Sequence, residues 1–287
     1  MCVTCGCSND AETKITNPET GEVVAMNSTG HHTHTHTLAD GTVITHSHSH
    51  EHHADSNAHI HAKMHGNTIT LEEKILAKND LIAAQNRGWF KGRDILALNL
   101  VSSPGSGKTT LLTRTINDLK DKFPIYVIEG DQETSNDAQK IQETGCKVVQ
   151  INTGTGCHLE AAMVERGLQQ LNPPLNSIVM IENVGNLVCP ALFDLGEKAK
   201  VAILSVTEGE DKPIKYPHMF RASEVMIITK IDLLPYVQFD VNCCIEYAKQ
   251  VNPKIQIFQV SATTGVGLES WYEWIAANVP SLAGAGL

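Results

Sequence analysis

The sequence predicts an α/β protein with a doubly wound, mostly parallel sheet of seven strands. Seven short apolar runs follow one another along the chain, and helix-length amphipathic segments separate them. Strands that are apolar throughout are typical of a sheet covered by helices on both faces. The first run leads directly into a glycine-rich loop, and ligands of such folds bind at the carboxyl ends of the strands.

The expected elements begin with a helix on the flank of the domain. Thr70 and Glu73 have the spacing of a capping box, and apolar side chains continue at helical spacing toward Gly88. The seven strands are then expected at residues 95–101, 125–129, 148–151, 177–181, 201–206, 225–229 and 255–260.

One globular domain is expected at residues 70–287, preceded by a tail at 1–30 and a His-rich linker at 31–66. The first 70 residues of the 287 contain too few large apolar side chains to form a second core. Twelve of the 14 histidines lie between His31 and His65, among small polar residues. Such a composition buries too little apolar surface to fold, so we expect disorder unless metal binds.

Charge and hydropathy exclude two classes of protein. The formal net charge of −10 and the lack of a basic stripe argue against a nucleic-acid binder. No apolar run is long enough to span a membrane and no signal peptide is visible, so a cytoplasmic protein is expected. In that reducing compartment, clustered thiols favour metal binding over disulfides. The isolated Cys146, Cys243 and Cys244 are expected to be small buried hydrophobic residues.

The glycine-rich loop SSPGSGKT at 102–109 matches the Walker A pattern in its required place between a strand and a helix. Its backbone N–H groups are expected to face the β-phosphate, with Lys108 on the β and γ oxygens and Thr109 on Mg²⁺. Ser102 stands where the pattern usually has its first glycine, and the alternative is a simple turn. The expected nucleotide-binding set is Gly105, Ser106, Gly107, Lys108, Thr109 and Thr110.

Two further strand ends point to guanine. Thr229-Lys230-Ile231-Asp232 resembles the NKxD motif of GTPases, with threonine in place of asparagine. The Asp232 carboxylate would accept from the guanine N1 and N2 donors, and the Lys230 stem would stack on the base. Adenine would leave these polar groups unpaired. Ser261 and Ala262, again ending a strand, resemble the second guanine loop. One alternative is that the KxD spacing arises by chance. Another is that the protein is an ATPase of a related P-loop group.

Acidic residues at other strand ends are candidates for the magnesium and water sites. They are Glu129 and Asp131 in Glu-Gly-Asp, and Glu182 in Ile-Glu-Asn. All lie where the γ-phosphate and Mg²⁺ are expected, and we expect Lys108, Asp131 and Glu182 to be the catalytic residues. Gly185 could allow the following loop to approach the γ-phosphate, although a glycine in a loop is more often only a turn.

Cysteine and histidine form two metal-binding candidates in the N-terminal region. Cys2, Cys5 and Cys7 place three thiols within six residues. Soft thiolates with a nitrogen donor suit Ni²⁺, and also Zn²⁺ or Cu⁺. The His-rich stretch is a low-affinity nickel store, a proton-sensitive linker or a spacer, and we favour the store. Its metal binding should fade as the pH falls through about 6.5, where imidazole takes up a proton.

A third candidate lies within the domain, where Cys157-His158 precedes a helix and Cys189 follows Glu182 on the same loop. Three ligands leave a coordination sphere incomplete, so a two-fold partner or water would have to complete it. The alternative is buried thiols and a capping histidine.

Taken in order, these motifs resemble the HypB family of nickel-inserting hydrogenase-maturation GTPases along essentially the whole chain. The resemblance implies hydrolysis of GTP to GDP and phosphate with Mg²⁺, and nickel at the N-terminal cysteines. It also implies Zn²⁺ or Ni²⁺ at Cys157, His158 and Cys189, in the interface of a GTP-dependent homodimer. The expected partners are the hydrogenase large subunit and other nickel-insertion accessory proteins.

The resemblance also suggests roles for the acidic residues. Similarity to dimeric P-loop GTPases implies that Asp131 binds Mg²⁺ or positions water and that Glu182 takes the Walker B position, although the division of roles stays open. Lys212 is a candidate contact across the dimer. No arginine near the switches could act in cis, so slow intrinsic hydrolysis is expected.

Two other functions are compatible with part of the sequence. UreG, the related urease accessory GTPase, typically has Cys-Pro-His at its metal site, whereas Cys189-Pro190 is followed here by Ala191. A nickel storage protein with a nucleotide domain of minor role is the other alternative. The intact Lys108, Thr109 and Asp232 argue against it.

Overall fold

The computed structural model describes residues 13–16, 23–26, 35–37, 43–45, 57–132 and 136–280, with side chains from residue 73 onward. Cys2, Cys5 and Cys7 lie outside the described residues, and so do the side chains of the His-rich stretch. Within the described part, no helix combines the length and apolarity needed to cross a membrane.

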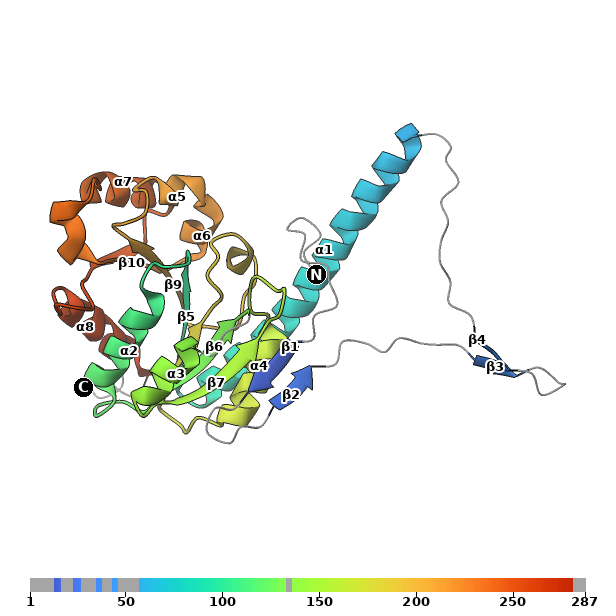
Figure 1. Cartoon of the computed structure of the whole chain (residues 1–287), viewed down its shortest axis with the longest axis horizontal. Helices are drawn as coiled ribbons and strands as arrows, with labels where there is room; N and C mark the ends of the chain where they lie inside the picture. Colours follow the sequence, from blue (N-terminus) through green and yellow to red (C-terminus); the bar gives the residue numbers. More distant parts are fainter. Residues whose placement is uncertain are drawn as a thin grey trace.

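Seven parallel strands form the main part of a sheet that has nine strands among the described residues (Figure 1). Their order is β11-β10-β9-β5-β8-β6-β7, and every neighbouring pair is parallel. All seven expected strands are present: β5 (Leu96–Ser102), β6 (Ile125–Asp131), β7 (Lys147–Asn152), β8 (Ile178–Glu182), β9 (Ala199–Ser205), β10 (Val225–Thr229) and β11 (Gln256–Gln259). The expected doubly wound α/β fold is confirmed.

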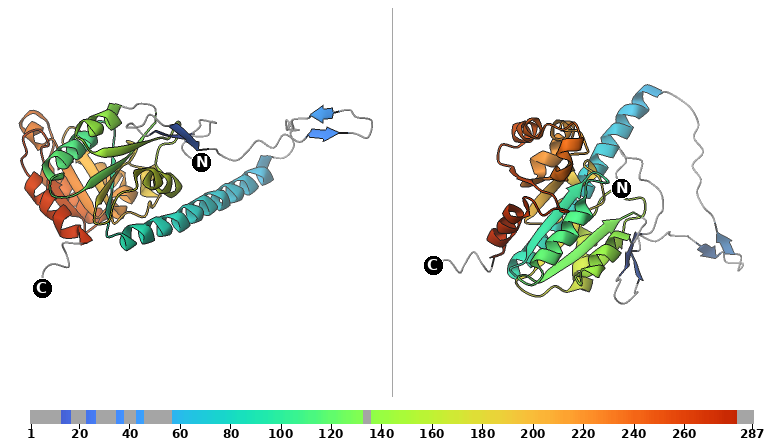
Figure 2. Two further views of the ribbon diagram at one scale, coloured as in Figure 1. Left: turned by 90° about the horizontal axis from the view of Figure 1, so that it is seen from below. Right: turned by 60° about the vertical axis from the view of Figure 1, so that its left-hand side comes forward.

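Helices cover both faces of the sheet (Figure 2). One face packs against α2 (Lys108–Leu119), α3 (Asn136–Glu143) and α8 (Leu268–Asn278). The other packs against α1 (Asn57–Gly92), α4 (Ala161–Leu171), α6 (Pro217–Ala222) and α7 (Val241–Val251). Short helical turns complete the chain: η1 (Cys189–Ala191), α5 (Lys212–Lys215) and η2 (Ile231–Tyr236).

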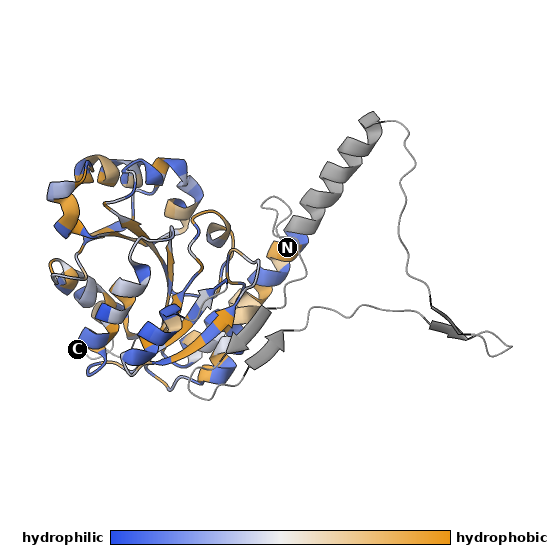
Figure 3. Cartoon of the chain, viewed as in Figure 1, coloured by the Kyte–Doolittle hydropathy of each residue, from blue (hydrophilic) through white to orange (hydrophobic). Residues whose placement is uncertain are grey.

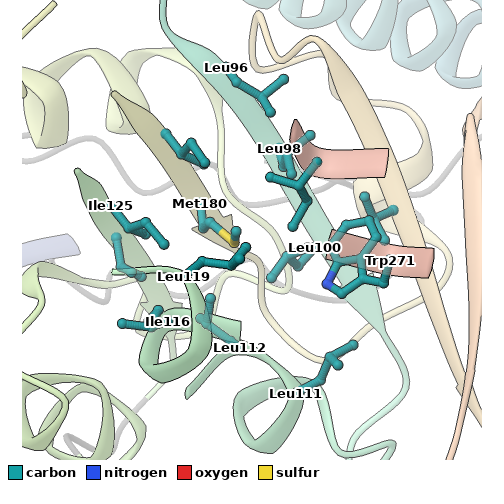
Figure 4. Packing of buried hydrophobic residues seen from close by; sticks show 14 of the residues in the cluster. Leu96, Leu98, Leu100, Leu111, Leu112, Ile116, Leu119, Ile125, Met180 and Trp271 are labelled. Atoms are coloured by element: carbon teal, nitrogen blue, oxygen red, sulfur yellow. The ribbon is translucent and has the colours of Figure 1, made fainter. Parts of the chain in front are cut away.

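The central strand β5 shows why both faces are apolar. Its alternate residues Leu96, Leu98 and Leu100 face α2 and Trp271 of α8 (Figure 4), because successive side chains of a strand point to opposite faces. Ala97 and Val101 pack on the other side. The strands are accordingly the most hydrophobic part of the domain (Figure 3).

The chain leaves β5 toward β6 and β7 on one side, returns to β8, and then crosses to β9 and β10 on the other. This reversal of direction beside β5 is a topological switch point, where loops separate and leave room for a ligand. The glycine-rich loop follows β5, so the switch point puts it at the centre of the carboxyl edge.

Four short strands precede α1 in the described residues. β1 (Thr13–Thr16) and β2 (Val23–Met26) form a hairpin, and β1 pairs antiparallel with β7. β3 (Thr35–Thr37) and β4 (Val43–Thr45) form a separate two-stranded sheet. The sequence predicts none of these strands, because their pairing is not visible in a periodic pattern.

The helix start expected at Thr70 is wrong, because α1 already begins at Asn57 and runs through Thr70. The segment before Thr70 contains Ala58, Ala62 and Met64, which favour a helix, and Gly66 costs only about 1 kcal/mol there. A capping-box spacing inside such a segment is therefore coincidental.

Two burial expectations need correction. β11 lies at the edge of the sheet and is only partly buried, because one of its sides has no neighbouring strand among the described residues. Cys146 and Cys244 are buried as expected, whereas Cys243 is only half-buried.

Gly196 should be far less tolerant of alanine than Gly88. Gly196 has φ +90°, and a β-carbon there would lie 2.5 Å from the backbone oxygen of Ala83 in α1. Gly88 lies within α1 with open space around it. In chemical denaturation, Gly196→Ala should lower the free energy of unfolding by about 2 kcal/mol or more, whereas Gly88→Ala should raise it by up to about 1 kcal/mol. Equal effects of the two substitutions would contradict the packing described here.

Candidate functional site

The glycine-rich loop between β5 and α2 lines a cavity of about 530 Å³. Gly105 and Gly107 have φ values of +75° and +88°, a region that side chains with a β-carbon rarely adopt. The loop therefore needs glycine at both positions, and α2 begins directly after it at Lys108. Glu129 and Asp131 of β6 and Asp137 of α3 supply the acidic side of the same cavity.

Glu182, at the end of β8, gathers the loop's functional side chains. Its Oε1 accepts from Nζ of Lys108 and from Oγ1 of Thr109, both at 2.7 Å. Oγ1 of Thr109 also lies 3.0 Å from Oδ2 of Asp137, a residue that no sequence motif singles out. Asp137 lies in the first turn of α3, and only the folded position of that helix brings it to Thr109.

Glu129 lies beside Glu182, because the two residues are register partners on β6 and β8. Burial of its side chain, together with the nearby Glu182 and Asp131 carboxylates, raises its pKa to about 9. Glu129 is therefore protonated at neutral pH in the absence of a cation.

The donors around Thr109 fit a hard divalent cation. Oε2 of Glu129 and Oε2 of Glu182 are buried and have no hydrogen-bond partner among the described residues. Asp131, at the end of β6, lines the same cavity with Asp137. Carboxylate and hydroxyl oxygens are the ligands that Mg²⁺ takes beside phosphates.

Thr229 and Lys230 fasten the glycine-rich loop to β10. Oγ1 of Thr229 donates to the carbonyl of Ser106 (2.6 Å), and Nζ of Lys230 donates to the carbonyl of Gly105 (2.7 Å). A β-carbon on Gly107 would meet the Lys230 stem at 3.4 Å. Thr229 stands where the NKxD motif has asparagine. Its hydrogen bond to the glycine-rich loop needs only a hydroxyl donor, which threonine supplies.

The two guanine-type segments are neighbours at the ends of β10 and β11. The N–H of Ile231 bonds to the carbonyl of Val260 (3.3 Å), which brings Asp232 close to the Ser261 loop. Ser261 is fully buried, and its Oγ accepts from the N–H of Thr264 (3.1 Å). Arg114 of α2 donates to the carbonyl of Ala262 (3.1 Å), a support that sequence alone did not suggest.

Cys157, His158 and Cys189 come together, although 31 residues separate His158 from Cys189 along the chain. Their candidate ligand atoms all lie within 4.8 Å of one another, the one such cluster found among the described side chains. Sγ of Cys157 lies 2.8 Å from Sγ of Cys189 and 3.6 Å from Nδ1 of His158.

His158 is held neutral and oriented. Its ring is buried and stacks on Phe193 at 3.9 Å between centroids. Burial lowers its pKa to about 4, so at neutral pH the ring keeps a free lone pair. Nε2 is buried without a hydrogen-bond partner in the described part of the chain. Thiol and neutral imidazole donors of this kind suit Ni²⁺ and Zn²⁺.

The loop from Glu182 to Cys189 touches both sites. A β-carbon on Gly185 would lie 3.2 Å from Pro104, so the loop passes directly against the glycine-rich loop. Nδ2 of Asn186 donates to the carbonyl of Cys157 (3.3 Å). One short segment therefore contacts the phosphate side at one end and the cysteine-histidine cluster at the other.

A second contact joins the sites through β6. Leu159, next to His158, is fully buried, and its side chain lies 2.7 Å from where a β-carbon on Gly130 would be. Gly130 separates Glu129 from Asp131, so the cluster packs directly on the strand that bears those carboxylates.

Lys212 also lies close to the glycine-rich loop, since its Nζ donates to Oγ of Ser103 (2.9 Å) and pairs with Glu208 (3.1 Å).

Comparisons with known proteins agree with this geometry. Residues 96–259 match the family described as CobW/HypB/UreG, nucleotide-binding domain. The chain is 56% identical over 220 residues to the hydrogenase maturation factor HypB of Rhizobium leguminosarum bv. viciae, which covers 77% of this chain and 74% of that protein. The HypB of Cupriavidus necator is 44% identical over 320 residues, covering 97% and 89% of the two chains. A solved structure of HypB from Helicobacter pylori in complex with nickel matches with a TM-score of 0.64 and 38% identity, over 69% of this chain and 93% of that one.

Replacing Glu129 by glutamine should change how stability depends on pH. A carboxyl group whose pKa is raised from 4.5 to about 9 by folding stabilises the protein fully below pH 4.5, and this stabilisation is lost as the pH rises toward 9. Without nucleotide or Mg²⁺, the free energy of unfolding of the wild type should therefore fall relative to Glu129→Gln between pH 6 and 8, by about 1 kcal/mol or more. Urea denaturation at both pH values measures the difference. The exposed Glu269→Gln serves as control, and wild-type and Glu129→Gln curves that stay parallel would show that Glu129 is ionised.

Proposed function

The chain belongs to the HypB hydrogenase maturation factors of the CobW/HypB/UreG family, and from this premise we propose that it is a GTP-hydrolysing nickel metallochaperone. In this proposal the protein delivers Ni²⁺ to the hydrogenase large subunit during maturation, together with other nickel-insertion proteins. The thiol chemistry involved requires a reducing compartment, and we place the protein in the cytoplasm on that ground.

The nucleotide half of the proposal is supported by the groups that meet around the glycine-rich loop. Backbone N–H groups of the loop and Lys108 would hold the β and γ phosphates, and Thr109 with Glu182 and Asp137 would hold Mg²⁺. The bound Mg²⁺ would neutralise charge that develops on the phosphate oxygens. Asp131 would orient the attacking water from the end of β6.

Base selection rests on Asp232, Lys230 and the Ser261-Ala262 loop. The carboxylate of Asp232 can only accept hydrogen bonds when ionised, which matches the donors of guanine and mismatches adenine. This polarity favours GTP over the ATPase alternative.

The metal half rests on Cys157, His158 and Cys189. These residues would hold Ni²⁺ as cargo, and Zn²⁺ fits the same donors by affinity. Three donors leave a position open, and a second copy of the chain related by two-fold symmetry would supply the rest. We therefore propose that GTP binding and metal binding both favour the homodimer.

One observation carries the connection between the two halves: the loop that begins at Glu182 packs on Pro104 and ends at Cys189. The γ-phosphate draws Lys108 from Glu182, because phosphate oxygens attract the ammonium strongly. Loss of the γ-phosphate on hydrolysis then shifts the same loop back and loosens the metal ligands.

We further propose that Cys2, Cys5 and Cys7 bind nickel tightly and that the His-rich stretch stores it. This part rests on the donor chemistry, which also suits Zn²⁺ or Cu⁺, and on membership of the HypB family, which favours nickel. A nickel store with an independent GTPase domain is the competing function, and the experiments below distinguish the two.

Replacing Asp232 by asparagine should reverse the base preference of the site. The amide donates where the carboxylate accepted, so affinity for GTP should fall about tenfold or more, while affinity for xanthosine triphosphate, which has an acceptor at position 2, should rise. Competition binding with both nucleotides and with ATP measures this. The exposed Asp121→Asn is the matched control. An unchanged GTP affinity would remove Asp232 from the base site, and a preference of the wild type for ATP would overturn the GTPase proposal.

Nickel uptake should depend on nucleotide and on the cluster cysteines together. Equilibrium dialysis of the full chain with Mg²⁺ should give about one more Ni²⁺ per dimer with a non-hydrolysable GTP analogue than with GDP. The Cys157→Ala/Cys189→Ala double variant should abolish that increment, and Cys243→Ala should keep it. Uptake that ignores both the nucleotide and these cysteines would favour the nickel store.

A further inference from the structure

Four buried polar side chains lie between the nucleotide site and the cysteine-histidine cluster, and neither site uses them directly. Asn99, Asn183, Glu197 and Lys200 are exposed by 0%, 1%, 8% and 6%. Burying a lysine and a glutamate costs several kcal/mol unless both are well paired. Their contacts show what the arrangement accomplishes.

Lys200, on β9, holds the turn that carries Cys189. Its Nζ donates to the carbonyl of Pro190 (2.7 Å) and to the carbonyl of Phe193 (3.2 Å). Pro190 follows Cys189, and the Phe193 ring stacks on His158. A single ammonium group therefore fixes the backbone next to one metal ligand and the residue that orients another.

Glu197 and Asn99 extend this contact toward the nucleotide site. Oε1 of Glu197 lies 3.7 Å from Nζ of Lys200 and accepts from Nδ2 of Asn99 (3.0 Å), while Oε2 accepts from the N–H of Leu195 (2.7 Å). Asn99 belongs to β5, three residues before the strand ends at the glycine-rich loop.

Asn183 completes the path. Its Nδ2 donates to Oδ1 of Asn99 (3.2 Å), and its Oδ1 accepts from the N–H of Leu159 (3.1 Å), the residue after His158. Asn183 also follows Glu182, so the peptide between them joins the carboxylate that binds Lys108 to this path. From Asn183, hydrogen bonds run through Asn99 to Glu197, and the ion pair at 3.7 Å continues the path to Lys200.

We propose that Lys200 and Asn183 are positioning residues of the cysteine-histidine cluster, and that the path Asn183–Asn99–Glu197–Lys200 couples the nucleotide state at Glu182 to metal affinity. Asn183 fixes the His158 side of the cluster and Lys200 the Cys189 side. A shift of the Glu182 peptide changes the distance between the two sides. This inference rests on the proposed nucleotide-gated function, and its test separates the two.

The test uses the full chain with Cys2, Cys5 and Cys7 changed to serine, so that the thiolate-to-nickel charge-transfer absorption reports Cys157 and Cys189. Ni²⁺ is titrated with Mg²⁺ and either GDP or a non-hydrolysable GTP analogue, and the ratio of the two affinities is the coupling. Lys200→Met and Asn99→Leu remove one link each at similar volume. The matched control is Lys198→Met, an exposed lysine two residues away.

Coupling in the parent chain is expected to be about fivefold or more, within the usual range for linked sites. It should fall below about twofold in Lys200→Met and in Asn99→Leu. Because both act on one path, the double variant should lose no more than either single one. Lys198→Met should keep the parent ratio, and Lys200→Arg, which can still donate to two carbonyls, should restore part of it.

Unchanged coupling in Lys200→Met and Asn99→Leu overturns the path. If the parent chain shows no coupling, the gated function fails, but the positioning role of Lys200 can still be tested. In that case Lys200→Met should weaken Ni²⁺ binding about fivefold or more with either nucleotide. Equal Ni²⁺ affinities of Lys200→Met and the parent chain would overturn the positioning role. If Lys200→Met fails to fold because Glu197 is left as an unpaired charge, the double variant Glu197→Gln/Lys200→Met removes both charges and is used in its place.

Discussion

The carboxylate of Glu182 is the contact on which the site depends. It accepts from Lys108 and Thr109 at 2.7 Å in a place that is 1% exposed, where such bonds are strong because little water competes. The same residue starts the loop that ends at Cys189. Any ligand that competes for Lys108 or Thr109 therefore acts on a buried carboxylate whose chain neighbours contact the metal cluster. The segment from Glu182 to Cys189 therefore contacts both the expected phosphate site and the metal cluster.

Helix α1 holds the two segments that follow the cluster residues. Nδ2 of Asn86 donates to the carbonyls of Ala161 and Leu195, and Asn79 bonds to the N–H of Ala161 and the carbonyl of Asp194. These contacts hold the segment after His158 and the segment after Cys189 against one rigid element. Arg87 adds an ion pair with Asp194, in which Nη2 donates to both carboxylate oxygens. These hydrogen bonds to α1 therefore limit how far the Cys157-His158 side and the Cys189 side of the cluster can move apart.

Particular residues show how far sequence reasoning reached. The glycine-rich loop and Glu182 were predicted from spacing and from their places at strand ends, and the resemblance to HypB implied the cysteine-histidine set. The structure brings each set together. Asp137 and Thr229 were missed or undervalued. An aspartate in a short helix looks like any solvated first-turn residue, and a hydroxyl that donates to a neighbouring loop leaves no periodic signal. Both act through contacts across distant parts of the chain.

The sequence by itself determined the alternation of apolar strands and amphipathic helices, and with it the parallel sheet and the position of the glycine-rich loop at its carboxyl edge. Local propensity and hydrophobic period are properties of neighbouring residues, so they can be read along the chain. The tertiary structure alone decided that Cys157, His158 and Cys189 meet, that β1 adds to the edge of β7, and that a buried path joins Asn183 to Lys200. These features depend on strand order and on which loops leave the sheet at the same edge, and no local pattern encodes either.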